Sequence, residues 1–166
     1  MSKSAEDILK TAILLERRGK AFYITAARDA ESEAVRKIFT IMAEEEDEHI
    51  KFLSRQFAEY KKSGKFAKND AKVPEDDTEM VCILSEQVKD EISAAGFEAA
   101  AISAAIDFEN RAVTVYQGRA DEATDPNEKE MYQMLADWER THHHLLHKLN
   151  EDLKEQIWHD NNFWPF

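Results

Sequence analysis

Hydrophobic side chains recur every three to four residues along four long segments of the chain, and this spacing predicts amphipathic α-helices. The segments span residues 4–28, 32–60, 97–121 and 125–154. The whole chain contains only 4 Gly and 3 Pro, whereas an all-β chain with many turns normally carries more of both. The pattern therefore favours an all-α protein, in which the alanine-rich segment 97–121 is expected to be the most buried helix.

Capping residues predict where two of these helices begin. Ser4 followed by Asp7 resembles a capping box, which satisfies the first free backbone N–H groups of a helix. Asp125 is a good N-cap, Pro126 suits the first helical position, and Glu128 places negative charge in the first turn. The first and last segments are therefore expected to start at these residues.

The connections between the segments predict the topology. Short turns join the first two helices and the last two, so each pair is expected to form an antiparallel hairpin. Residues 61–96 form a longer connection, polar at first and compatible with a short helix over 78–92. The fold predicted for 1–166 is a single domain, a ferritin-like four-helix bundle of two antiparallel helical hairpins with one long crossover connection. The aromatic tail, 156–166, is expected either to dock on the bundle or to meet another subunit.

Composition narrows the class of function. The formal net charge of −12 argues against nucleic acid as the main partner, because phosphate binding needs a basic surface. The single cysteine, Cys82, excludes an intramolecular disulfide and a Cys-x-x-Cys metal site. There is no apolar run of 18 or more residues and no apolar signal core near Met1, so no membrane partner is expected and a cytoplasmic location is predicted.

An internal repeat at an offset of 93 residues carries the candidate chemistry. Residues 12–23 align with 105–116, and residues 42–49 align with 135–142. Each half contains a Glu followed 30 residues later by Glu-x-x-His. The aligned pairs are Glu16 with Glu109, Glu46 with Glu139, and His49 with His142.

All four glutamates share a helical stripe with apolar residues, so they are expected to point into the core. Four buried carboxylates repel one another and each is costly to bury alone. Two divalent cations would balance the four negative charges, and a His three residues after a Glu lies on the same helix face. Carboxylates with one imidazole per ion suit iron or manganese better than a structural zinc site.

At this point the chain resembles the ferritin-like di-iron carboxylate superfamily, and within it the rubrerythrin-type proteins. The resemblance rests on ILLERRGKAFY, MAEEEDEHIKFL, AAIDFENRAVTVY and LADWERTHHHLLHKL and covers about residues 5–155. It implies a centre of two iron ions, with manganese or zinc as possible substitutes. It also implies the ligand set, in which Glu46 and Glu139 bridge the metals, Glu16 and His49 complete one site, and Glu109 and His142 complete the other.

The chain departs from the rubrerythrin pattern in two places. It lacks the four cysteines of a rubredoxin module, so the resemblance implies a separate, rubredoxin-like electron-donor protein. Ala112 occupies the position where rubrerythrins usually carry an additional Glu, and its repeat mate is Gly19. These small residues are expected to leave room beside the metals for oxygen or hydrogen peroxide.

Other residues near the candidate ligands have two interpretations. Tyr23 and Tyr116 each follow a candidate terminal Glu by seven residues, so each either hydrogen-bonds a ligand, as a candidate catalytic residue, or only packs in the core. His143 is an alternative ligand to His142, although the repeat register favours His142. In the acidic run 44–48 only the third residue, Glu46, is expected to face inward.

The function predicted from the sequence is a di-iron oxidoreductase that oxidises Fe(II) with hydrogen peroxide or oxygen, as a rubrerythrin-like peroxidase or a ferroxidase. One alternative is a non-catalytic iron-binding or storage protein of the same fold. Another is a metal-free helical interaction module. The resemblance also implies a homodimer.

Overall fold

Five helices make up the regular structure in a computed structural model of the chain, which describes residues 4–71, 78–92 and 96–160. The helices are α1 (Ala5–Asp29), α2 (Glu33–Ser63), α3 (Thr78–Glu91), α4 (Phe97–Glu122) and α5 (Pro126–Asp160). They agree closely with the four long segments and the short connecting helix that the hydrophobic pattern predicts.

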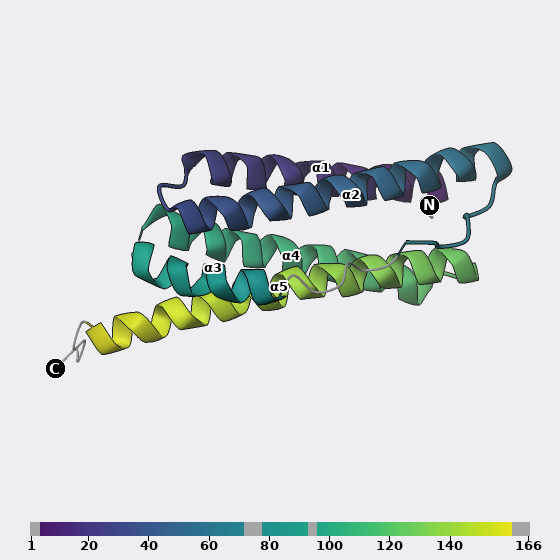
Figure 1. Cartoon of the computed structure of the whole chain (residues 1–166). Helices are drawn as coiled ribbons and strands as arrows, with labels where there is room; N and C mark the ends of the chain where they lie inside the picture. The colour runs from purple at the N-terminus through teal and green to yellow at the C-terminus, as the bar shows by residue number, and fades with distance from the viewer. Residues whose placement is uncertain (1–3, 72–77, 93–95, 161–166) are drawn as a thin grey trace.

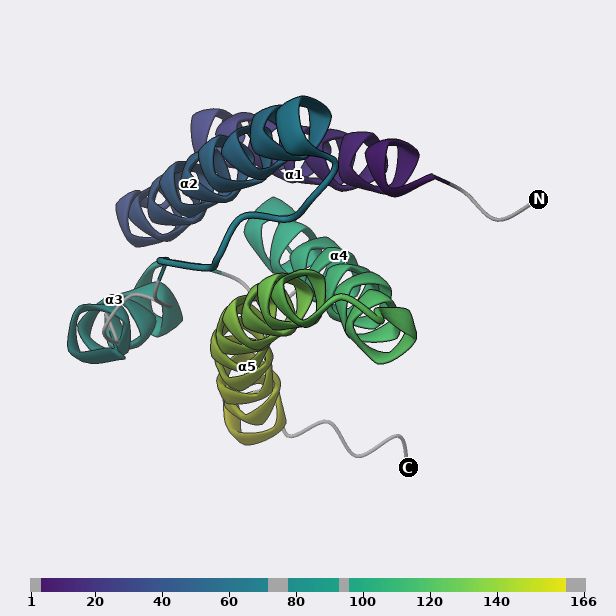
Figure 2. The same ribbon diagram turned by 90° about the vertical axis from the view of Figure 1, so that its right-hand side faces the viewer.

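The helices form two antiparallel hairpins that face each other (Figure 1). Helix α1 packs along α2, and α4 packs along α5. Viewed toward the end of the bundle, the hairpins form two layers, and α3 lies at one side against α2 and α5 (Figure 2). The predicted ferritin-like bundle of two hairpins with a long crossover is confirmed.

Capping side chains set the helix ends that the sequence predicts. The hydroxyl of Ser4 accepts a hydrogen bond from the backbone N–H of Asp7 at 3.2 Å. Oδ1 of Asp125 accepts from the backbone N–H groups of Asn127 and Glu128, at 2.8 and 3.1 Å. Helix α2 ends at Ser63 and is capped by Gly64, whose φ of +68° is a left-handed conformation that glycine adopts without steric cost.

The apolar core consists of two clusters, one toward each end of the bundle. One cluster includes Phe39 and Leu146, and the other includes Leu53 and Leu135. In every long helix the residues of one cluster precede the candidate ligands and those of the other follow them. The bundle therefore surrounds its candidate ligands with apolar packing on both sides.

Two expectations need correction. Helix α5 continues to Asp160, so residues 156–160 of the expected aromatic tail belong to a helix, and residues 161–166 lie outside the described part of the chain. Helix α4 is not the most buried helix, because 8 of its 26 residues are buried against 11 of 31 in α2, and Phe97 and Val115 are 49% and 43% exposed. Alanine side chains are small, so an alanine-rich sequence does not by itself make a helix fully buried.

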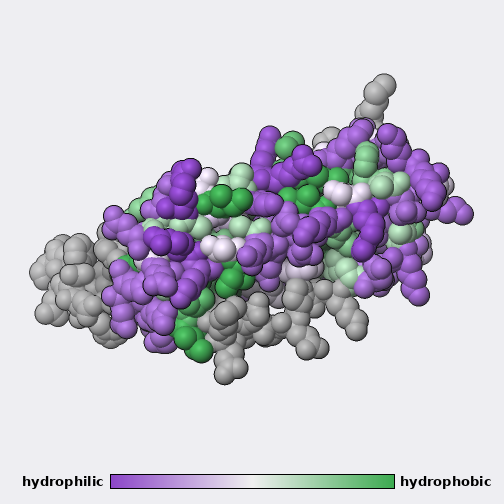
Figure 3. All heavy atoms as spheres, turned by 45° about the horizontal axis from the view of Figure 1, so that its top comes forward, coloured by the Kyte–Doolittle hydropathy of each residue, from purple (hydrophilic) through white to green (hydrophobic). Residues whose placement is uncertain are grey.

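The surface over α1 and α2 is mainly hydrophilic, with hydrophobic side chains in separate small patches (Figure 3). This distribution agrees with the large excess of acidic residues. None of the helices in the described ranges has the combination of length and apolar character that a membrane span requires.

Candidate metal centre

Six side chains from the four long helices meet at the middle of the bundle. They form two groups of four residues, and within each group one candidate ligand atom per residue lies within 4.8 Å of the others. The first group contains Glu16, Glu46, His49 and Glu139, and the second contains Glu46, Glu109, Glu139 and His142. Glu46 and Glu139 belong to both groups. All six residues predicted from the sequence are thus brought together, and none is more than 3% exposed.

The helical repeat explains how this cluster forms. On α2, Glu46 and His49 are three residues apart, so they lie on the same helix face as the buried Met42 and Leu53. On α5, Glu139 and His142 have the same spacing. Each hairpin adds one further Glu from its other helix, and packing the two inward faces together brings the six groups into one layer.

The two imidazoles turn the same nitrogen atom toward the carboxylates. Nδ1 of His49 lies 3.0 Å from both Glu16 Oε2 and Glu139 Oε1, and 3.7 Å from Glu46 Oε2. Nδ1 of His142 lies 3.3 Å from Glu139 Oε2 and 3.7 Å from Glu109 Oε1. The imidazole rings are nearly parallel, with centroids 5.9 Å apart. Nitrogen and oxygen donor atoms therefore converge on two adjacent positions.

Several of these donor atoms have no hydrogen-bond partner among the described residues. They are both carboxylate oxygens of Glu46 and of Glu139, Oε2 of Glu109, and Nδ1 of His142. A buried carboxylate oxygen without a partner costs several kcal/mol (on the order of the desolvation of a charged group). A pair of divalent cations would satisfy these atoms, so the residues present fit the dimetal centre that the sequence pattern implies.

The pKa values of the clustered carboxyl groups reflect their burial and their proximity to one another. Burial and the neighbouring carboxylates of Glu16 and Glu139 raise the pKa of Glu46 well above its ordinary value. Burial and Glu139 raise the pKa of Glu109 to about 8. Burial also opposes ionisation of Glu139, but the adjacent His49 and His142 outweigh it and lower its pKa well below the ordinary value.

The imidazoles complete this charge balance. Burial alone would lower the pKa of His49 and of His142, but the surrounding carboxylates outweigh burial and raise both pKa values well above normal. Protons on the imidazoles and on some of the carboxyl groups thus compensate the negative charge of the cluster. Binding a metal ion must displace these protons.

Tyr23 and Tyr116 each hydrogen-bond a glutamate of the opposite half. The hydroxyl of Tyr23 donates to Glu109 Oε1, and the hydroxyl of Tyr116 donates to Glu16 Oε1. Burial and the nearby glutamates raise the pKa of both tyrosines well above 10.0, so both remain protonated donors. Of the two interpretations from the sequence, contact with a candidate ligand is the one found in the structure. A catalytic role stays a prediction.

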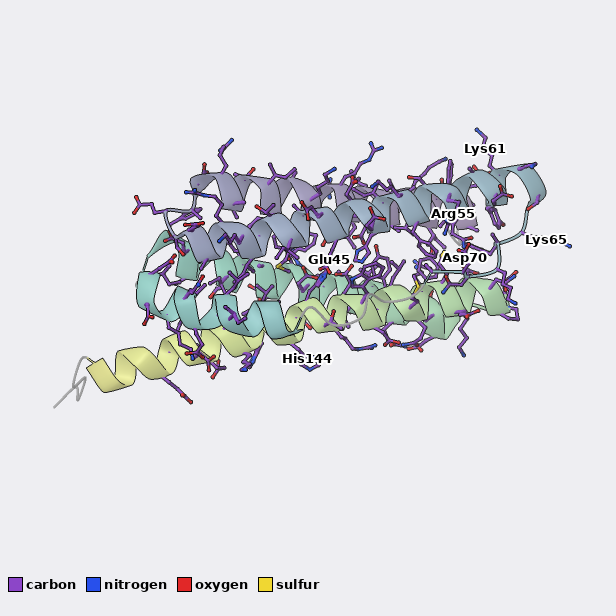
Figure 4. All side chains as sticks on the ribbon, in the orientation of Figure 1. Glu45, Arg55, Lys61, Lys65, Asp70 and His144 are labelled. Atoms are coloured by element: carbon purple, nitrogen blue, oxygen red, sulfur yellow. The ribbon has the colours of Figure 1, made fainter. Side chains whose placement is uncertain are left out.

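The sequence interpretation missed Glu45, which it assigned to a solvated face. Oε2 of Glu45 lies 2.5 Å from Nε2 of His142, and the side chain is 22% exposed. Glu45 is labelled in Figure 4, at mid-length of the bundle on the side of α2 that faces the other hairpin. A signal was available, because Glu45 directly precedes an inward-facing Glu and lies at the edge of the buried stripe of α2.

Two further expectations can be compared with the structure. His143 belongs to neither four-residue group and stacks instead with His147, at a centroid distance of 5.9 Å. His144 is exposed on the outer side of α5 (Figure 4). The room expected beside Gly19 is filled, since an added Cβ would lie 2.7 Å from Phe108 Cε1 and 3.2 Å from Glu46 Cδ.

Comparisons with known proteins agree with this geometry. A family model described as Rubrerythrin matches residues 7–150, which is most of the chain and includes all six clustered residues. No curated protein and no solved structure matches the chain.

Proposed function

Because the chain belongs to the rubrerythrin family, we propose that it is a di-iron oxidoreductase that oxidises Fe(II) with hydrogen peroxide or oxygen. The observation that carries this proposal is the pair of buried four-residue groups that share Glu46 and Glu139. Four carboxylates balance the charge of two divalent ions, and a donor set of carboxylates with two imidazoles suits iron. Manganese or zinc would be substitutes.

Each residue of the cluster has a proposed role. Glu46 and Glu139 would hold both metal ions, because they belong to both groups. Glu16 and His49 would complete one position, and Glu109 and His142 would complete the other. In the bundle these side chains approach from four helices, so the positions of the ions depend on the packing of both hairpins.

The remaining residues would control protons and water. Tyr23 and Tyr116 donate hydrogen bonds to Glu109 and Glu16, which orients the terminal carboxylates. The apolar clusters on both sides exclude water from the axis of the bundle. When bound there, two ferrous ions would supply one electron each, and with two protons these electrons would reduce one hydrogen peroxide to two water molecules.

The return of electrons would require a separate donor. Cys82 is the chain's single cysteine, so the chain cannot supply the four thiolates of a rubredoxin centre. A rubredoxin-like protein is the proposed reductant of a peroxidase cycle. Without such a donor the same centre would act as a ferroxidase or an iron store, and the absence of a carboxylate at Ala112 favours that second candidate.

Stopped-flow absorbance distinguishes these candidates. Anaerobic protein loaded with two equivalents of Fe(II) is mixed with one equivalent of hydrogen peroxide, and then with a reduced rubredoxin-like donor. Fast oxidation followed by re-reduction over repeated cycles supports the peroxidase. A single stoichiometric oxidation without recycling supports iron storage, and failure to bind two metal ions overturns both.

A further inference from the structure

Glu45 and Trp138 occupy equivalent positions in the two halves of the repeat, one residue before Glu46 and Glu139. Each contacts the imidazole that comes from the opposite half. Oε2 of Glu45 lies 2.5 Å from Nε2 of His142. The rings of Trp138 and His49 meet edge to face, with centroids 4.2 Å apart and planes at 84°. Equivalent imidazoles thus have chemically different neighbours.

The difference concerns the nitrogen that points away from the metal positions. Both imidazoles turn Nδ1 toward the glutamates, as the distances of 3.0 Å from His49 to Glu16 and 3.3 Å from His142 to Glu139 show. When Nδ1 gives its lone pair to a metal ion, Nε2 carries the hydrogen and needs an acceptor. His142 has the carboxylate of Glu45 as this acceptor. Nε2 of His49 is buried and has no partner among the residues described.

A carboxylate behind a ligating imidazole has a known physical effect. It fixes the tautomer and the ring orientation and strengthens electron donation from the other nitrogen, and its loss typically lowers metal affinity by about 10- to 100-fold. An indole ring offers no comparable acceptor, since contacts between N–H groups and aromatic rings are weak. The imidazole of His142 is therefore the stronger electron donor, and that of His49 is the weaker one.

On the premise of the dimetal centre proposed above, we propose that its two metal positions are inequivalent. The position formed by Glu109 and His142 binds the first ion. It binds about 10- to 100-fold more tightly than the position formed by Glu16 and His49. Glu45 and Trp138 are the positioning residues that set this difference.

The surroundings of these two residues provide a matched control. Glu45 and Trp138 both line an open groove of about 1320 Å³ along α2, and the exposed Glu44 lines the same groove. Glu44 is adjacent in sequence to Glu45 and carries the same charge, but it is exposed, and the carboxylate that meets Nε2 of His142 is that of Glu45. Removing Glu44 tests the general effect of charge in the groove, and removing Glu45 tests the contact with His142.

The first experiment locates the first ion. Full-length, metal-free protein is crystallised with one equivalent of Mn(II), and anomalous diffraction measures the occupancy of each position. The proposal expects most of the Mn(II) beside Glu109 and His142. Equal occupancy, or preferential occupancy beside Glu16 and His49, overturns it. Location is decisive because a first ion repels a second in any close pair of sites, so unequal affinities alone would not distinguish the positions.

The second experiment measures both Mn(II) affinities by isothermal titration calorimetry in variants. Glu45→Leu is expected to weaken the first affinity by about 10- to 100-fold, while Glu45→Gln retains an acceptor oxygen and recovers part of the loss. Glu44→Leu is expected to leave the ratio of the two affinities unchanged. Equal loss of both affinities in Glu45→Leu would indicate a merely structural role and overturn the proposal.

The reciprocal substitution adds the missing acceptor. Trp138→Glu is expected to tighten the second affinity by about tenfold and leave the first unchanged, whereas Trp138→Phe, which keeps an aromatic ring, changes neither affinity. An unchanged second affinity in folded Trp138→Glu contradicts the proposal. If circular dichroism shows this variant to be unfolded, the Glu45 series and the crystals decide.

The two proposals fail in different ways. Wild-type protein that binds fewer than two Mn(II) ions contradicts the dimetal centre itself. Protein that binds two ions, with the first ion distributed equally between the positions, contradicts only the inequivalence.

Discussion

The two hairpins contribute the same candidate ligands to the bundle but surround them differently. Glu16 corresponds to Glu109, and the tyrosines of each half reach the terminal glutamate of the other. Around this symmetrical set, Glu45 on α2 corresponds to Trp138 on α5. In the proposed centre, the symmetry of the candidate ligands would provide two metal positions, whereas the different neighbours of His49 and His142 would make these positions unequal.

A second pair of equivalent residues also differs in polarity between the two halves. Tyr23 stacks on Phe39, at a centroid distance of 5.8 Å, and Tyr116 stacks on Tyr132, at 6.1 Å. Phe39 and Tyr132 are repeat mates and both are buried, but the hydroxyl of Tyr132 has no hydrogen-bond partner in the described residues. One half thus buries a polar atom where the other half buries none.

The largest expected effect comes from removing a glutamate that both halves share. Glu46→Ala and Glu139→Ala should each abolish the binding of two metal ions per chain, because each carboxylate belongs to both four-residue groups. Metal analysis after anaerobic loading measures this stoichiometry. The exposed Glu44→Ala on the same helix is the matched control and should retain two ions. Two tightly bound ions in either test variant would refute the bridging assignment.

Removing the metal ions should leave the buried carboxylates of the two halves to repel one another. The stability of the metal-free protein should therefore depend on pH. The raised pKa values of Glu46 and Glu109, the latter about 8, mean that the folded metal-free protein holds protons that the unfolded chain releases above pH 4.5. Stability of the metal-free protein should therefore fall as pH rises from about 4.5 to 8. The raised pKa values of His49 and His142 act in the same direction above 6.5. The lowered pKa of Glu139 acts only below 4.5, where stability falls as pH falls.

Thermal unfolding with and without Mn(II) measures this dependence. Free metal at 100 times its Kd should stabilise the protein by about 2.7 kcal/mol. The gain at a fixed Mn(II) concentration should be larger at pH 8 than at pH 5, since fewer protons have to be displaced. A gain that is equal at both pH values, or unchanged unfolding on chelation, would contradict the charge balance described for the cluster.

The crossed tyrosine contacts offer a symmetrical comparison. Tyr23→Phe and Tyr116→Phe each leave a buried glutamate oxygen without its donor, at an expected cost of about 1 to 3 kcal/mol in the free energy of unfolding. Chemical denaturation of the metal-loaded variants measures this cost. Similar losses would support the equivalence of the two contacts. A loss in only one variant would show that the asymmetry extends to the terminal glutamates.

The smallest effect is expected at the unequal aromatic pair. Tyr132→Phe removes an unpaired buried hydroxyl, so it should change stability by less than about 1 kcal/mol, in the stabilising direction. Phe39→Tyr places a hydroxyl in the equivalent position of the other half and should destabilise. Chemical denaturation under identical conditions compares the two, and a marked loss in Tyr132→Phe would reveal a partner for that hydroxyl.

Much of the site could be predicted from the sequence because its determinants are local. Glu46 and His49 share a face through the period of one helix, and Glu139 and His142 repeat that spacing. The apolar neighbours of each Glu indicate an inward orientation, and the capping residues Ser4 and Asp125 predict two helix starts. The wrong predictions concern side chains at the edge of a helix's buried face or next to another helix. Glu45 was assigned to solvent because its own helix places it among four acidic neighbours.

The sequence by itself therefore determined the helices, the hairpin pairing and the six inward side chains, since helical periodicity and a repeat are properties of neighbouring residues. Only the tertiary structure decided that Tyr23 reaches Glu109, that Phe108 fills the space beside Gly19, and that Glu45 rather than solvent meets His142. These contacts join separate helices. Their geometry depends on the distance and the rotation between helices, which packing of the whole bundle sets and no single segment encodes.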